Sequence, residues 1–407
     1  MNIAIRTIND HELEAFSRCQ AMAFGRDFHP DTLEGRKTIF EFDRNYAAFD
    51  GDTIVGTCGI FSHTMTVPGG SVRSAGVTMV SVRPTHRRRG ILTAMMAAQL
   101  DQLADRREPV ATLWASEAPI YGRFGYGLAH ETADYRINRD HARIRYTPRS
   151  PGSLRQIDVN EAREAWPPVW EAAGREVPGF ISRTPAWWQQ RVFRDDPVWR
   201  DGFTENFYIN YEGPAGIEGY LRYRVKPGWD DHGIRQGTVK VEELMSLTTD
   251  AYAALWDYAF NIDLVATITA GYRRVDEPLI HLLHDSRQFI RTSGDGLWLR
   301  VVDVEQALSA RRYTVPGRVV IEVHDAFRPA NTGRYLLEGG PDGAQCRRTG
   351  EAAAVFLSVA DLGAAYLGGT RLGVLAEAGR VGGDPAAVRL ADAMFAWRVT
   401  PWCPEMF

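Results

Sequence analysis

The sequence predicts an α/β (α+β) protein of several domains, because strand-type and helix-type segments alternate in three successive blocks of its 407 residues. In each block, stretches with period-two or continuous apolar character come before stretches with a 3.6-residue apolar period. A chain of this length exceeds one ordinary domain, so two or three domains are expected. Apolar residues make up 44% of the chain and charged residues 24%, which is typical of globular proteins.

The first block reads as strand, helix, strands, helix and strand. Asp10 is expected to cap the first helix, and the Asp-Gly pair at residues 50–51 predicts a hairpin. A stripe of apolar residues predicts a second helix from about Arg89 to Leu103. The expected strands are Ile3 to Ile8, Asn45 to Phe49, Thr53 to Phe61, Val72 to Val82 and Val110 to Ala115.

The second block follows a Pro/Gly/Ser-rich segment at residues 146–153, which predicts a linker. Strands are expected near residues 207–211, 219–225 and 239–245, and a helix through Phe260 follows them. This order repeats that of the first block and indicates an internal duplication. Four tryptophans near its start are expected to pack in a core or between domains, with a role in lining an acceptor pocket as the alternative: Trp166, Trp170, Trp187 and Trp188.

The third block begins near Asp295 and has strands near residues 318–323, 333–337 and 354–358, with helices near residues 358–366 and 386–395. It ends in Pro-Trp-Cys-Pro-Glu-Met-Phe at residues 401–407. Chain ends are usually polar and frayed, whereas this one is apolar and stiffened by proline. Leaving it in water would forgo burial worth about 1.5–3 kcal/mol for each large side chain, so the tail is expected to dock.

Charge and composition exclude several classes of function. The formal net charge of −4 offers no basic field for nucleic acid, and it suits cationic small molecules better. The apolar runs are short and the N-terminus lacks a signal-peptide pattern, so no membrane span and a cytoplasmic location are expected. Four scattered cysteines argue against disulfides and zinc knuckles. His281 and His284 have apolar neighbours and lack a third ligand, which favours core packing over a metal site.

The most informative stretch is residues 79–92, where an apolar strand runs into a basic turn that opens an amphipathic helix. Backbone N–H groups and the dipole at a helix N-terminus attract anions. Gly90 lets a pyrophosphate approach the backbone closely, and Arg87, Arg88 and Arg89 supply phosphate-matching donors. A solvated basic helix start is the alternative interpretation, but the preceding apolar strand favours an anion site.

This stretch, Arg87-Arg88-Arg89-Gly90-Ile91-Leu92, resembles the acetyl-CoA site of the GNAT (GCN5-related N-acetyltransferase) superfamily, although Leu92 departs from its small final residue. Together with Ala115-Ser116-Glu117 and Ile120-Tyr121-Gly122-Arg123-Phe124-Gly125-Tyr126-Gly127, it is similar to the Eis (enhanced intracellular survival) family of actinobacteria over nearly the whole chain. The resemblance implies two tandem GNAT-like domains with mixed sheets, the second degenerate, and a C-terminal α+β domain like sterol carrier proteins.

The resemblance places these domains at residues 1–148, 149–293 and 294–407. It also implies hexamers that transfer the acetyl group of acetyl-CoA to amines, including positions on aminoglycosides. The second block lacks an Arg-x-x-Gly turn after its strand, so no cofactor is expected there. No metal is required, and the expected partners are a small-molecule amine and further copies of the chain.

Carried over by the resemblance, the backbones of Val80 and Val82 would bind pantetheine, and Arg87, Arg88 and Gly90 would face the pyrophosphate. Tyr121 matches the family's catalytic tyrosine and would protonate the leaving thiolate, as a phenol with a pKa near 10 can. Tyr126 is expected to be structural.

The acceptor side is also inferred from the resemblance. Trp114, which stands in place of a pocket histidine, is expected to bind substrate together with Asp27 and Glu117. The docked tail would place the Phe407 α-carboxylate beside the acceptor amine as the base. Packing alone is the alternative for the tail.

These features predict an N-acetyltransferase for small cationic amines that works by direct transfer in a ternary complex. Two other functions stay open from the sequence. One is a protein-lysine acetyltransferase. The other is a catalytically weak protein that binds an apolar ligand in its C-terminal domain.

Overall fold

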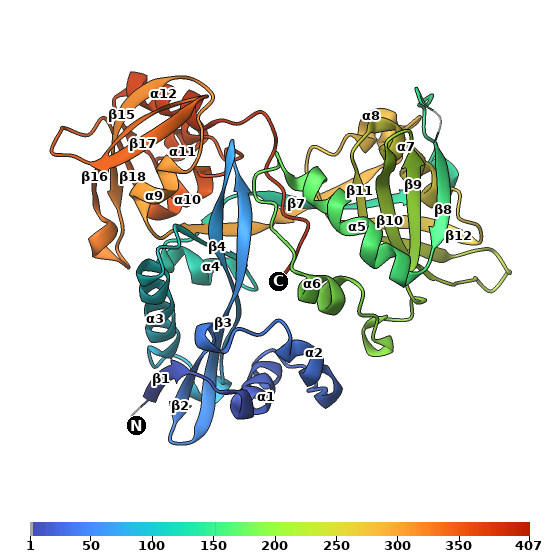
Figure 1. Cartoon of the computed structure of the whole chain (residues 1–407), viewed down its shortest axis with the longest axis horizontal. Coiled ribbons are helices and arrows are strands. Elements are labelled where there is room, and N and C mark those ends of the chain that lie inside the picture. The colour runs from blue at the N-terminus through green and yellow to red at the C-terminus, as the bar shows by residue number, and fades with distance from the viewer. Residues whose placement is uncertain (1–2, 151) are drawn as a thin grey trace. The chain divides into compact units, whose positions relative to one another are not determined.

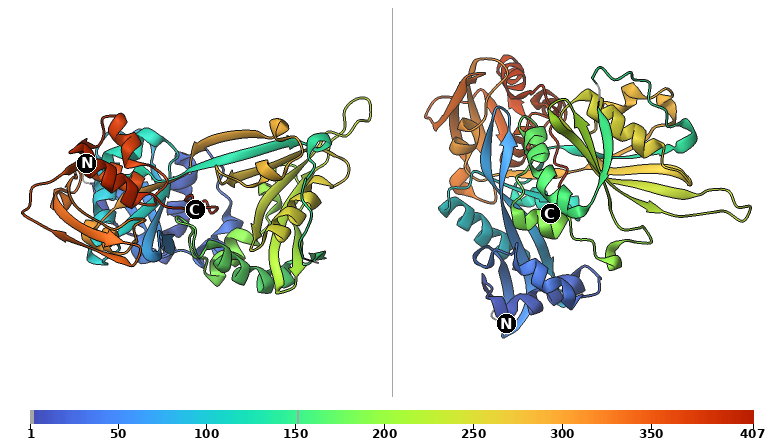
Figure 2. Two further views of the ribbon diagram at one scale, coloured as in Figure 1. Left: turned by 90° about the horizontal axis from the view of Figure 1, so that it is seen from above. Right: turned by 45° about the vertical axis from the view of Figure 1, so that its right-hand side comes forward.

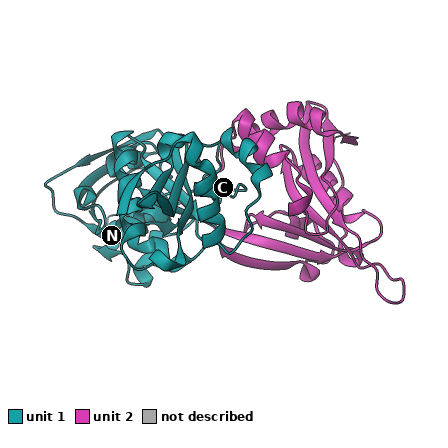
Figure 3. Ribbon diagram, turned by 90° about the horizontal axis from the view of Figure 1, so that it is seen from below, with its two compact units in different colours: residues 1–130, 178–182, 295–407 teal, residues 131–177, 183–294 magenta. Residues whose placement is uncertain are grey.

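The computed structural model describes residues 3–150 and 152–407, which form two compact units (Figure 3). Unit 1 contains residues 1–130, 178–182 and 295–407, and unit 2 contains residues 131–177 and 183–294. Each unit is therefore assembled from segments that lie far apart in the sequence. None of the helices in the described ranges is both long and apolar enough to cross a lipid bilayer.

Unit 1 holds a seven-stranded sheet, here called sheet 1, with the strand order β1-β2-β3-β4-β5-β14-β6. Its long β3–β4 hairpin turns at Pro68 and Gly69 and is the blue ribbon in Figures 1 and 2. The 15-residue helix α3 (Ile91–Asp105) connects β4 to the parallel strand β5 and buries an apolar stripe. The strand bounds are β1 Ile3–Thr7, β2 Tyr46–Asp50, β3 Thr53–Val67, β4 Gly70–Val82, β5 Val110–Trp114, β14 Leu297–Val301 and β6 Gly127–Leu128.

Unit 2 holds a second seven-stranded sheet, sheet 2, with the order β8-β9-β10-β11-β12-β7-β13. Helix α5 (Val159–Gly174) and helix α7 (Thr249–Phe260) pack on it. Trp166, Trp170, Trp187 and Trp188 are buried, as core packing predicts. The strand bounds are β8 Ser153–Ile157, β9 Phe207–Gly213, β10 Gly216–Lys226, β11 Gly237–Ser246, β12 Val265–Arg273, β7 Glu131–Asn138 and β13 Ile290–Asp295.

The two sheets repeat one topology, which agrees with the predicted duplication. In each sheet five consecutive strands come first, and the sixth position is taken by a strand from the other part of the chain. Strand β7 follows β6 in sequence but pairs with β12 in sheet 2, whereas β14 follows β13 but pairs with β5 in sheet 1. The sheets thus exchange one strand. The predicted domain boundaries at residues 148 and 293 divide the chain by sequence, and they stay a prediction.

The C-terminal region adds a five-stranded sheet to unit 1 with the order β17-β16-β15-β18-β19. Helices α9 to α12 accompany it: α9 Val304–Ser309, α10 Val359–Ala365, α11 Leu372–Glu377 and α12 Pro385–Phe395. The strands are β15 Gly317–His324, β16 Gly333–Gly340, β17 Gly343–Arg348, β18 Val355–Ser358 and β19 Gly382–Gly383.

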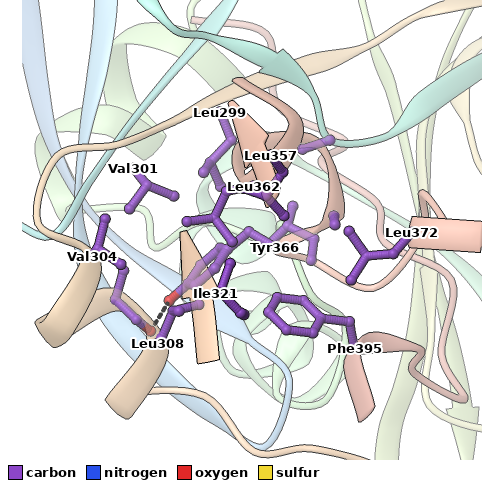
Figure 4. Close-up of a cluster of buried hydrophobic side chains, with 14 of the residues drawn as sticks. Leu299, Val301, Val304, Leu308, Ile321, Leu357, Leu362, Tyr366, Leu372 and Phe395 are labelled. Carbon is purple, nitrogen blue, oxygen red and sulfur yellow. Dashed lines mark hydrogen bonds between the residues drawn. The ribbon is translucent and has the colours of Figure 1, made fainter. Parts of the chain in front are cut away.

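The exchanged strand β14 joins this C-terminal sheet to sheet 1 through one apolar core (Figure 4). Leu299 and Val301 of β14 lie in the same buried cluster as Ile321 of β15 and Leu362 of α10. Arg300, on the alternate positions of β14, forms a fully buried ion pair with Asp325 at 2.5 Å. The C-terminal region is therefore anchored to the sheet from which the site below is built.

Candidate active site

The parallel strands β4 and β5 pair over only three residues before they separate. Ser74, Ala75 and Gly76 pair with Val110, Ala111 and Thr112, yet β4 continues for six more residues to Val82. The register therefore leaves the end of β4 without a β5 partner among the described residues. A strand edge with available N–H and C=O groups can accept an extended ligand as an added strand.

A β-bulge interrupts β4 within this separated part. On β3, Thr57 pairs with Ser81 and Gly59 pairs with Thr78, so Met79 and Val80 together oppose the single residue Cys58. Met79 has a φ of 54°, a conformation that a bulky side chain seldom adopts.

The direction of the backbone groups beyond the bulge can be inferred from the hydrogen bonds of β4 to β3. The N–H of Arg83 donates to the carbonyl oxygen of Val55 at 2.8 Å. Successive N–H groups of a strand point to opposite sides, so the N–H of Val82 points to the side of β5. Val82, which the sequence predicts as a pantetheine contact, thus faces the space that the separated strands leave.

The basic turn lies between β4 and helix α3. Arg88 has a φ of 63° and Gly90 a φ of 76°, and Gly90 is the N-cap of α3. A Cβ atom built on Gly90 would meet no atom within 4 Å, so the approach to the backbone is open. Arg87, Arg88 and Gly90 are exposed, and the first N–H groups of a helix have no intrahelical partners. The structure therefore presents the predicted anion-binding residues at one helix start.

This helix begins at Ile91, whereas the apolar periodicity predicts a start near Arg89. The reason is that Arg88 and Gly90 have positive φ angles. A residue with a left-handed backbone cannot be part of a right-handed helix, so the helix starts after Gly90. The expected residues are the same, but more of them belong to the turn and are available to a ligand.

Tyr121 ends the short helix α4 (Ala118–Tyr121) and is only 5% exposed. It lies in the same buried cluster as Cys58, the residue opposite the bulge. Burial, with a smaller contribution from the nearby Cys58, raises the pKa of Tyr121 to about 12, although a hydrogen bond with Ser116 acts to lower it. The phenol therefore keeps its proton at neutral pH and can serve as a proton donor.

Tyr126 packs edge-on against Tyr121 with ring centroids 6.1 Å apart. It is buried more deeply, at 1% exposure, and burial raises its pKa well above the usual range, opposed by the charge of Arg300. Its position in the core agrees with the expected structural role, whereas Tyr121 lies at the end of its helix beside the exposed residue Glu117.

The C-terminal tail docks within unit 1, as its apolar sequence predicts. The N–H of Trp402 donates to the carbonyl oxygen of Pro178 at 2.8 Å, and the N–H of Cys403 donates to Nε2 of His130 at 3.1 Å. The indole Nε1 of Trp114 donates to the carbonyl oxygen of Glu405 at 2.9 Å. Backbone groups of the tail are thus held at three points.

The last residue of the tail lies at the place where β4 and β5 separate. The ring of Phe407 is 5.4 Å from the ring of His63 on β3. A Cβ atom on Gly76 would come within 3.0 Å of Phe407 and 2.9 Å of His63. Gly76 is the last residue of β4 that pairs with β5, so the absence of its side chain makes room for the terminal ring there.

The three predicted acceptor residues are placed differently from one another. Trp114 binds the tail through its indole N–H, so it contacts the chain's own C-terminal segment. Glu117 is the exposed N-cap of α4, four residues before Tyr121. Asp27 is exposed in the connection between α1 (Leu13–Ala23) and the 3-10 turn at Pro30–Thr32. Their part in acceptor binding stays a prediction.

Some residues of this region carry no sequence signal of their own. They are a threonine and a glycine in strands and a buried histidine: Thr57, Gly76 and His130. Each contacts a partner that is distant in the sequence, namely Met79, Phe407 and Cys403 respectively.

The histidines considered as metal ligands, His281 and His284, are exposed, so the expected core packing is wrong. They lie at the surface because α8 (Leu279–Leu282) buries Leu279 instead. No cluster of three metal-ligating side chains occurs within the described ranges.

The corresponding gap of sheet 2 is bridged by a side chain. Strand β11 pairs with β12 only as far as Val241 and Ala270 and then continues to Ser246. Arg273 of β12 donates from Nη1 to the carbonyl oxygen of Leu244 at 3.1 Å and is held by the buried carboxylate of Glu277 at 2.7 Å. An arginine therefore binds the β11 backbone where the end of β4 is open in sheet 1.

Comparisons with known proteins agree with this architecture. Residues 4–129 and 179–301 each match an acetyltransferase (GNAT) domain, and residues 304–404 match a sterol carrier protein domain. A protein of Streptomyces avermitilis described as an uncharacterized N-acetyltransferase is 44% identical, with 91% of both chains covered. N-acetyltransferase Eis of Mycobacterium tuberculosis is 34% identical, with 92% of both chains covered.

Among solved structures, Eis1 of Mycobacterium abscessus is similar with a TM-score of 0.85 and 34% identity, covering 99% of this chain and all of the other. This similarity spans both GNAT-like sheets and the C-terminal region, as the sequence predicts.

Proposed function

This chain belongs to the Eis family of GNAT N-acetyltransferases, and we propose that it transfers the acetyl group of acetyl-CoA to primary amines of small cationic molecules. Aminoglycosides are the acceptor class proposed from the family resemblance, and a hexameric assembly is proposed on the same ground.

One observation supports this proposal: the C-terminal tail of unit 1 brings the ring of Phe407 to the point where β4 and β5 separate, and we propose that the α-carboxylate of this residue acts there. The ring of Phe407 lies against Gly76 at the end of the β4–β5 ladder. An amine acetyltransferase needs a proton acceptor near the thioester, because an ammonium group is not a nucleophile.

The separated end of β4 fits acetyl-CoA. The backbones of Val80 and Val82 would bind the pantetheine arm as an added strand, and Arg87, Arg88 and the open backbone at Gly90 would bind the pyrophosphate. Sheet 2 has Arg273 in the corresponding gap and no arginine–glycine turn before α7. One acetyl-CoA per chain, in unit 1, is therefore proposed.

The chemical steps then use three groups. The Phe407 α-carboxylate accepts a proton from the acceptor ammonium, directly or through one water. The free amine attacks the thioester carbonyl carbon, and a backbone N–H, that of Val80, stabilises the oxyanion. The intermediate collapses as the C–S bond breaks, and Tyr121 donates its phenolic proton to the leaving thiolate. The phenolate then takes up the second proton of the former ammonium nitrogen, directly or through water, which leaves a neutral amide and restores Tyr121.

The acceptor class is tested by following thiol release with acetyl-CoA and three kinds of compound: an aminoglycoside, a lysine peptide and an apolar ligand without an amine. The proposal predicts turnover with the aminoglycoside, with kcat/KM at least about tenfold above that for the peptide. Faster turnover of the peptide would assign a protein-lysine acetyltransferase. Tight binding of the apolar ligand without turnover of either amine would assign a binding protein.

Replacement of Tyr121 by Phe should lower kcat by about 10²–10⁴-fold at saturating acetyl-CoA, because only the donated proton is removed. The dissociation constant of acetyl-CoA should stay within twofold of the wild-type value. Since the pKa of Tyr121 is raised to about 12, deprotonation of this residue should not reduce kcat below about pH 10. Tyr126→Phe is the matched control, and a larger loss in that variant would show that the roles of the two tyrosines are reversed.

A C-terminal extension of a few residues should abolish turnover, because it converts the α-carboxylate of Phe407 into an amide. Deletion of Phe407 should do the same, while an N-terminal tag of the same length leaves kcat unchanged. Every variant should keep the unfolding temperature of the wild-type protein and its affinity for acetyl-CoA. Full activity of a folded, C-terminally extended protein would show that the tail only packs.

A further inference from the structure

The bulge in β4 is fixed by a buried hydroxyl on the neighbouring strand. Oγ1 of Thr57 donates to the carbonyl oxygen of Met79 at 2.6 Å and lies 2.7 Å from Oγ of Ser81. Thr57 is fully buried and Ser81 is 8% exposed, so water competes little for these bonds.

Counting protons gives this network a direction. A threonine hydroxyl has one proton, which Thr57 donates to Met79. The short contact with Ser81 therefore requires the Ser81 hydroxyl to donate to Thr57. The chain of bonds runs from Ser81 through Thr57 to the Met79 carbonyl, and each donor strengthens the next.

The geometry of the Met79–Val80 peptide determines which N–H group points into the gap between β4 and β5. The peptide bond between Met79 and Val80 is trans, because the described residues contain no cis peptide. In a trans peptide the C=O of one residue and the N–H of the next point in opposite directions. Thr57 holds the Met79 carbonyl toward β3, so the Val80 N–H points toward β5, where the ladder has already ended at Gly76.

A strained backbone needs such a fixed partner. Met79 has a φ of 54°, and a residue in this region can relax toward an ordinary strand conformation unless its surroundings hold it. Rotation of the Met79–Val80 peptide plane would turn the Val80 N–H away from the gap. The Thr57 hydroxyl opposes that rotation because it binds the carbonyl of the same peptide plane.

We propose that Thr57, assisted by Ser81, is a positioning residue that aims the Val80 N–H at the thioester carbonyl of acetyl-CoA. This inference rests on the proposed function and names a residue outside the predicted site. Thr57 touches neither substrate and acts only through the Met79–Val80 peptide.

The test compares Thr57→Val, which keeps the shape and removes the hydroxyl, with Thr57→Ser, which keeps the hydroxyl. Thr57→Val should lower kcat/KM for acetyl-CoA by about 10–100-fold, because a misdirected oxyanion donor loses much of its effect. It should weaken binding of acetyl-CoA by about 3–10-fold, the worth of one hydrogen bond. Binding of coenzyme A, which lacks the thioester carbonyl, should stay within twofold. Thr57→Ser should restore both quantities.

Thr132→Val is the matched control, because Thr132 of β7 is also buried and donates its hydroxyl to a carbonyl of the adjacent strand, that of Arg273, at 3.2 Å. It should lower the unfolding temperature to a similar extent as Thr57→Val and leave both ligand affinities unchanged.

The two levels of the account fail in different ways. A wild-type protein that binds no acetyl-CoA would overturn the proposed function and this inference with it. A wild-type enzyme that turns over, beside a Thr57→Val variant that differs from it only in unfolding temperature, would overturn this inference alone. Equal weakening of acetyl-CoA and coenzyme A binding would also overturn it, because the thioester carbonyl would then not be the group affected.

Discussion

The early end of the ladder between β4 and β5 is the constraint on which the rest of the site depends. Pairing stops at Gly76 and Thr112, and the groups of β4 that are proposed to bind acetyl-CoA lie beyond that point. The bulge at Met79 and Val80 and the arginine–glycine turn follow along β4, and Phe407 lies against Gly76 itself. Gly76, at the last paired position, completes the pairing with β5 and, because it has no side chain, leaves space for the ring of Phe407.

The duplication explains why the chain has two similar sheets and one proposed cofactor site. Both sheets have the same strand order and a parallel pair that separates early. In sheet 2 the Arg273–Glu277 ion pair binds the carbonyl of Leu244, and a two-residue connection replaces the arginine–glycine turn. The exchanged strand β14 gives sheet 1 a shared core with the C-terminal region, whose last residues contact Trp114 of β5 and Gly76 of β4.

Local features of this protein could be predicted from its sequence, and long-range ones could not. The Asp-Gly hairpin, the strands to Val82 and Ala115 and the Arg87–Gly90 turn follow from residues close together in the chain. The exchange of β7 and β14 depends on pairing between strands more than a hundred residues apart, which leaves no local signal. Trp114 is expected to bind substrate, and no local pattern predicts that its indole N–H binds the Glu405 carbonyl. The sequence around Thr57 does not predict its hydrogen bond to the Met79 carbonyl, because that bond depends on the bulge in the neighbouring strand.

Amide hydrogen exchange with and without acetyl-CoA tests the central claim most directly, namely that the ligand adds to the open end of β4 in unit 1. The account predicts slower exchange at Val80, at Val82 and at residues 90–92, because these N–H groups acquire ligand partners. The matching segment of unit 2, residues 244–251, should exchange at the same rate in both samples. Protection of residues 244–251 without protection of residues 80–92 would contradict the account.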